Sequence, residues 1–175
     1  FIMVLCAPVA EELIFRKLLI DRLAQYGEGV AVLFSGLMFG LFHGNLNQFV
    51  YAFVLGLCFG FIYVKTGNIR YTIGLHMLVN FLGSVLGVAI LKWLGDDFLS
   101  IASDPAGMMS YMTGNFGKLI VYFIYIFLLL GVAIAGIILF IVNLKKIRFL
   151  PGMNTLPKGK RFSTTVLNVG MALYM

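Results

Sequence analysis

The stretch LIVYFIYIFLLLGVAIAGIILFIVNL, residues 119–144, contains no charged side chain. It is long enough to cross a lipid bilayer as one helix, which needs about 20 apolar residues. The rest of the 175-residue chain is similar, since 61% of all residues are hydrophobic, only 11% are charged, and the mean hydropathy is +1.01. A soluble domain carries about 25% charged residues. We therefore predict an all-α integral membrane protein, built as a polytopic bundle of transmembrane helices.

Apolar runs separated by charges or by clusters of Gly, Asn and Pro predict about five helices in this chain. The runs cover residues 1–26, 30–43, 48–64, 69–91 and 119–144. Residues 95–117 carry three aspartates and a proline and are expected to form an exposed loop. We expect residues 1–148 to form the membrane-embedded core and residues 149–175 to form a basic tail.

The placement of basic residues predicts the orientation of the chain. Arg16, Lys17 and Arg22 flank the first turn, and Lys65 and Arg70 flank the third. A basic cluster follows the fifth run, as Lys145, Lys146, Arg148, Lys158, Lys160 and Arg161. Alternating crossings put all three groups on one side, and Lys and Arg are enriched in cytoplasmic segments. The protein is therefore expected to be a multi-pass cell-membrane protein with a cytoplasmic tail. The net charge of +6 is explained by this flanking cluster, which favours membrane lipid over nucleic acid as its partner.

Three ionisable residues interrupt the first apolar run, in the sequence Glu11-Glu12-Leu13-Ile14-Phe15-Arg16. A charged side chain in the middle of a membrane helix costs about 2.5–3.5 kcal/mol on insertion scales, so the cluster needs a reason. On a helix Glu12 and Arg16 are four residues apart and can pair, whereas Glu11 is turned about 100° away from Glu12. The arginine can therefore neutralise one carboxylate and leave Glu11 available as a general base. A purely architectural charge cluster is the alternative.

Two histidines and an asparagine lie in later apolar runs. His43 ends its run one turn after Phe39, and His76 and Asn80 are four residues apart on one helix face. A histidine N–H and an asparagine amide that point to one place can stabilise an oxyanion. An interfacial histidine and an interhelical polar clamp are the alternatives. Because His43 lies about 20 Å along its run and His76 about 10 Å along its own, the two meet only if helices are staggered, tilted or broken.

Zinc is a further alternative at these residues. Glu11, His43 and His76 could supply three ligands of the types that zinc accepts. The sequence H-E-x-x-H, which places zinc-binding histidines and a general base on one helix, is absent. The sequence leaves open whether the site works without a cofactor or with zinc, and zinc is the weaker option.

Three motifs carry a resemblance to a known family. They are, in chain order, Glu11-Glu12-xxx-Arg16, Phe39-xxx-His43 and His76-xxx-Asn80. Together they resemble the CPBP family of intramembrane proteases, which includes CAAX prenyl endopeptidases and bacterial bacteriocin-processing or self-immunity proteins. The resemblance covers about residues 5–90, and the loop at residues 65–68 is similar to that of bacterial members. Members of the family have additional helices, which implies that the first ones are missing from this chain.

The resemblance implies a role for each matching residue. Glu11 matches the glutamate that activates water with the help of His43, His76 and Asn80 match the oxyanion-stabilising pair, and Glu12 and Arg16 match supporting positions. Family names often say metalloprotease, but the same residues fit a metal-free glutamate mechanism.

The expected function is that of a CAAX-protease-like intramembrane endopeptidase. Its substrates would be membrane-embedded or tail-like peptides, or membrane proteins, whose peptide bonds are hydrolysed by glutamate-activated water. The alternative is a bacteriocin self-immunity or scaffold protein that binds a peptide in the same cavity without cutting it. A proton-coupled transporter also uses buried Glu and His, and ranks last.

Overall fold

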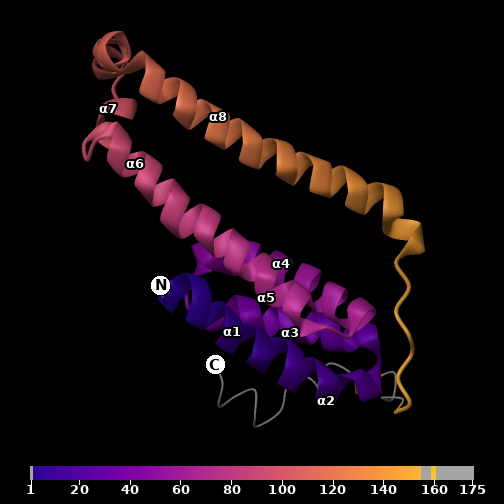
Figure 1. The fold of residues 1–175 in the computed structure, drawn as a ribbon. Helices are drawn as coiled ribbons and strands as arrows, with labels where there is room; N and C mark the ends of the chain where they lie inside the picture. The colour runs from indigo at the N-terminus through magenta and orange to yellow at the C-terminus, as the bar shows by residue number, and fades with distance from the viewer. Residues whose placement is uncertain (1, 155–158, 161–175) are drawn as a thin grey trace. The chain divides into compact units, whose positions relative to one another are not determined.

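A computed structural model describes residues 2–154 and 159–160 (Figure 1). Within these residues the chain is mainly helical and contains no β-strand, which confirms the all-α class. The chain divides into two compact units, one formed by the described parts of residues 1–78 and 149–175, the other by residues 79–148. Each unit is described by itself. The division into a core and a tail at residue 148 stays a prediction, and tail residues 155–158 and 161–175 lie outside the described residues.

A continuous helical segment over residues 2–26 begins the first unit. It contains α1 (Ala7–Glu12) and α2 (Asp21–Leu23), and the turns between them, Leu13–Ile20, are π-helical. Pro8 lies near the start of α1, directly after the π-helical turn Ile2–Cys6, and without an N–H it donates no hydrogen bond to that turn. π-helical turns occur frequently at functional sites. The carboxylates of Glu11 and Glu12 are therefore located where the backbone changes from α to π.

A hairpin of two helices, α3 (Glu28–Phe42) and α4 (Leu46–Thr66), packs against this segment. A Cβ atom on Gly56 would lie 2.8 Å from the Cα of Gly36, so the two helices approach at a distance that only glycine permits. The Ser35 hydroxyl donates a hydrogen bond of 2.8 Å to the carbonyl of Phe15. This bond joins α3 to the π-helical turns that follow the two glutamates.

The helix α5 (Ile69–Asn80) supplies the third part of the first unit. Its buried residues are Thr72 and His76, which are four residues apart and therefore share one face. The backbone continues as a helix through Phe81–Gly87 into α6 (Val88–Leu94). The fourth apolar run thus forms one helix of 26 residues, Ile69–Leu94.

Residues 149–154, which we name the strap, return to the turn between the first segment and α3. The backbone N–H of Glu28 donates to the carbonyl of Leu150 at 3.1 Å, and the N–H of Leu150 donates to Oε2 of Glu28 at 2.9 Å. Asn154 donates to Gln25 through both its backbone N–H and its side-chain amide, at 2.9 and 2.8 Å. Lys65, near the end of α4, also pairs with Glu28. The start of the tail is therefore a built part of the first unit.

The second unit contains α6, the short α7 (Phe98–Ala102) and the 39-residue α8 (Pro105–Asn143). Figure 1 shows α6 and α8 side by side, joined through α7, and the core between them is formed by Leu94, Phe98 and Leu119. The expectation of a loop over residues 95–117 is wrong. Asp104 accepts hydrogen bonds from the backbone N–H groups of residues 106 and 107, so it caps a helix whose first residue is Pro105.

Three helices are long and apolar enough to cross a membrane, within the residues that the structure describes. They are Leu46–Thr66, Ile69–Leu94 and Pro105–Asn143. The helix α3 is apolar but shorter, at 15 residues. These helices confirm that the chain is a helical membrane protein.

Candidate active site

The carboxylate of Glu12 and the guanidinium of Arg16 form a buried ion pair. Nε of Arg16 lies 2.9 Å from Oε2 of Glu12, and both side chains have no exposed surface. The pairing expected from their spacing of four residues is therefore present. A buried ion pair costs less than an isolated buried charge, because each partner compensates the other.

Two phenylalanines enclose the guanidinium of Arg16. Its central carbon lies 4.6 Å from the ring centroid of Phe39 on α3 and 5.6 Å from that of Phe59 on α4. None of its three nitrogens forms a hydrogen bond among the described residues, and the contact of Nε with Glu12 is an ion pair only. The aromatic faces compensate part of this deficit, because a ring quadrupole attracts a cation at such distances.

His76 connects α5 to both glutamates. Its Nδ1 lies 3.0 Å from Oε1 of Glu12, and its Nε2 lies 3.7 Å from Oε2 of Glu11. The imidazole is 4% exposed and lies 5.5 Å from each of the rings of Phe39 and Phe59. Glu11 is less enclosed than Glu12, with 18% of its side chain exposed. The two carboxylates therefore face opposite nitrogens of one histidine.

His43 lies at the C-terminal end of α3 and is half-buried. Its Nδ1 lies 2.8 Å from the carbonyl oxygen of Phe39, and since a carbonyl can only accept, Nδ1 carries the proton. In the neutral ring, Nε2 is then the acceptor. The ring of Phe39 lies 5.0 Å from that of His43 and 5.5 Å from that of His76. One phenylalanine thus contacts both histidines, although they lie at different positions along their runs.

The remaining candidate, Asn80, ends α5 one helical turn after His76 and belongs to the second unit. Sequence reasoning missed Phe59, since nothing distinguishes it from the other aromatic residues of its apolar run. It also missed the contact between Glu12 and His76. No signal in the sequence indicated this contact, which joins residues 64 positions apart.

No group of three His, Cys, Asp or Glu side chains is arranged to hold a metal ion within the described part of the chain. The set considered for zinc, Glu11, His43 and His76, is thus not brought together as three ligands. No step below is assigned to a metal.

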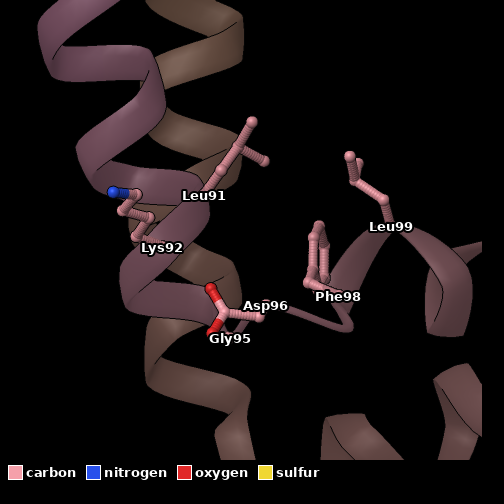
Figure 2. A pocket seen from close by; sticks show the side chains of 6 residues that line it. All are labelled: Leu91, Lys92, Gly95, Asp96, Phe98 and Leu99. Carbon is pink, nitrogen blue, oxygen red and sulfur yellow. The ribbon is translucent and has the colours of Figure 1, made fainter.

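A small pocket in the second unit lies apart from these residues in the sequence. Its lining consists of Leu91, Lys92, Gly95, Asp96, Phe98 and Leu99 (Figure 2). It contains one ammonium and one carboxylate among apolar side chains, and none of the candidate residues. We therefore assign it no role in the chemistry.

The fold and the site define a helical membrane protein that holds carboxylates and imidazoles in contact inside a helical unit. Residues 1–82 match the family model described as type II CAAX prenyl endopeptidase Rce1-like. This match agrees with the resemblance carried by the three motifs, and it covers less than half of the 175-residue chain.

A curated relative gives a second comparison. The chain is 32% identical over 74 residues to the "Putative membrane peptidase YdiL" of Bacillus subtilis (strain 168). The aligned stretch is 42% of this chain, and it spans only 30% of the relative's length. No solved structure matches the chain.

Proposed function

We propose that this protein is an intramembrane endopeptidase that uses Glu11 to activate water. The observation that carries the proposal is the contact of His76 with both glutamates, 3.0 Å from Glu12 and 3.7 Å from Glu11. Ionisable residues inside membrane helices are rare and mark functional sites. The match of residues 1–82 to the Rce1-like family supports a hydrolytic role for this cluster.

In the proposed reaction, Glu11 and His43 hold a water molecule beside the scissile carbonyl. Glu11 takes a proton from this water, and the oxygen attacks the carbonyl carbon to give a tetrahedral oxyanion. His76 and Asn80 donate hydrogen bonds to that oxyanion. His76 can do so when its Nε2 carries a proton, and the neighbouring group at Nε2 is Glu11, which has just received one. The oxyanion then collapses and the C–N bond breaks, while the proton passes to the leaving amine, which completes the hydrolysis.

The substrate must present an extended backbone to the site. Peptide groups in a bilayer are normally locked in helical hydrogen bonds, so a cleavable segment has to be unwound or has to be a peptide tail. We propose membrane peptides, or tails of membrane proteins, as the substrate class. We further propose a bacterial cell membrane as its location, with the basic residues after α8 in the cytoplasm.

The test compares peptide cleavage by the wild type and by Glu11→Gln. Full-length protein is reconstituted in liposomes and incubated with a library of tagged membrane and tail-like peptides, with and without a chelator. Because Gln is nearly isosteric but cannot accept the proton, we expect a loss of about 10²–10⁴-fold in rate. Glu28→Gln is the matched control, since Glu28 contacts Lys65 and Leu150 and none of the candidate residues.

Each outcome of this comparison has a distinct meaning. Cleavage that survives the chelator and is lost only in Glu11→Gln supports the glutamate mechanism. Cleavage that the chelator abolishes and zinc restores would replace it by a metal-dependent one. If Glu11→Gln cleaves as fast as the wild type, Glu11 is not the base. If the wild type cleaves no peptide while it still binds one, the proposal fails in favour of a binding role.

A further inference from the structure

The contacts of Glu12 give it a role more specific than support. We propose that Glu12 is the positioning residue of the site, which fixes the proton on Nδ1 of His76 and thereby directs Nε2 toward Glu11. The expected effect on cleavage rests on the proposed function, whereas the position of the proton on His76 does not.

The first step concerns the hydrogen-bonding character of Glu12. One oxygen lies 2.9 Å from Nε of Arg16 and the other lies 3.0 Å from Nδ1 of His76. As a carboxylate in an ion pair with Arg16, Glu12 can only accept hydrogen bonds. The proton between Glu12 and His76 therefore belongs to Nδ1.

The second step concerns the plane of the His76 ring. Phe39 and Phe59 both lie 5.5 Å from it, and the same two rings enclose the guanidinium of Arg16. The ring is thus held by aromatic contacts and at Nδ1 by the acceptor. With Nδ1 in contact with Glu12, Nε2 is the remaining nitrogen, and Oε2 of Glu11 lies 3.7 Å from it.

The third step is the comparison with His43. In that ring, too, Nδ1 is engaged, because it donates a hydrogen bond of 2.8 Å to the carbonyl of Phe39. Both histidines of the chain therefore expose Nε2 as the free nitrogen, one through a backbone carbonyl and the other through a carboxylate. A carboxylate has the same role in the serine-protease triad, where it holds the imidazole in the correct tautomer and orientation.

The test reads the tautomer of His76 directly by nuclear magnetic resonance. In full-length protein with ¹⁵N-labelled histidine in nanodiscs, the two imidazoles of this chain are assigned by the signals that disappear in His43→Asn and in His76→Asn. The decisive variant is E12M/R16M, which removes the acceptor together with the opposite charge, so that no unpaired charge remains buried. Its matched control is E12Q/R16M, in which the amide carbonyl can still accept from Nδ1.

We expect a protonated Nδ1 of His76 in the wild type and in E11Q. In E12M/R16M we expect a non-protonated Nδ1 signal, and in E12Q/R16M a return toward the wild-type signal. A wild type with a non-protonated Nδ1, or two double variants with the same spectrum, would overturn the inference.

Cleavage provides a second readout that separates this inference from the proposed function. In the active protein, E12M/R16M should lower kcat at least 100-fold with KM within about threefold, and E12Q/R16M should recover part of kcat. An unchanged kcat in E12M/R16M would refute the positioning role. If the wild type cleaves nothing, the proposed function fails, while the tautomer measurement still decides the role of Glu12.

Discussion

Replacing Arg16 by Met tests whether the buried ion pair with Glu12 holds the site together. Methionine is close to arginine in length and keeps apolar contact with Phe39 and Phe59. It removes the cation that lies 2.9 Å from the fully buried carboxylate of Glu12. The variant therefore leaves one buried charge without its partner, and little else changes.

The cost of this change follows from the geometry. At an effective dielectric constant of about 20, two unit charges about 3 Å apart attract each other by about 5.5 kcal/mol. Breaking a buried pair by removing one partner typically costs about 3–5 kcal/mol, because the remaining charge stays desolvated. We expect Arg16→Met to lower the free energy of unfolding by about that amount. The double variant E12M/R16M should recover most of it, because it leaves no charge behind.

The assay is unfolding in mixed micelles with increasing SDS, followed by the helical circular dichroism signal. Lys17→Met is the matched control: Lys17 pairs with Asp21 at 2.8 Å, with the same spacing and on the same segment, but the side chains are 57% and 44% exposed. An exposed pair of this kind contributes little to stability, because solvent screens its charges. If Arg16→Met costs no more than Lys17→Met, or if the double variant is less stable than Arg16→Met, the reasoning from burial is refuted.

Two further predictions concern packing and pH. Gly56→Ala should destabilise the hairpin of α3 and α4 by about 1–3 kcal/mol in the same assay, because its Cβ would press on the backbone of α3. Gly74→Ala is the control and should cost no stability, because a Cβ there meets no atom within 4 Å. Equal losses of stability in the two variants would contradict the close approach of α3 and α4. Burial raises the pKa of Glu28, but hydrogen bonds from Lys65 and the backbone N–H of Leu150 outweigh it and hold the pKa below its ordinary value. A lowered carboxylate pKa stabilises the folded state above the ordinary value, and this contribution is lost as the pH falls through the lowered one. Amide exchange in the strap should therefore accelerate under acid conditions, and Glu28→Gln should remove this pH dependence. If the variant shows the same pH dependence of exchange as the wild type, the role of Glu28 is contradicted.

Much of the fold could be predicted because apolar runs of membrane length have few alternative structures. The runs at 48–64, 69–91 and 119–144 correspond to the three candidate spans, Leu46–Thr66, Ile69–Leu94 and Pro105–Asn143. The start of the last helix was missed because its first turns are not apolar. The signal was present in Asp104 and Pro105, a capping residue followed by the residue best suited to begin a helix.

The candidate site could be predicted in part. A spacing of four residues was enough to pair Glu12 with Arg16, since helical geometry fixes it. The contact of Glu12 with His76 spans 64 residues of sequence and depends on how α5 packs, which no local pattern records. For the same reason Phe59 was not distinguished from its aromatic neighbours. The chemistry of Glu11, His43, His76 and Asn80 stays a prediction that the proposed cleavage assay tests.

The strap sets an order of events in the making of this protein. The bond from Leu150 to Glu28 joins residues that are 122 positions apart. During synthesis, Glu28 therefore lacks the hydrogen bond from Leu150 until α8 and the residues beyond it have left the ribosome. Contacts between distant residues close late, because the chain between them must first be ordered. The segment that carries both glutamates leaves the ribosome long before the strap, so the turn at its end is among the last parts of its unit to form all of its contacts.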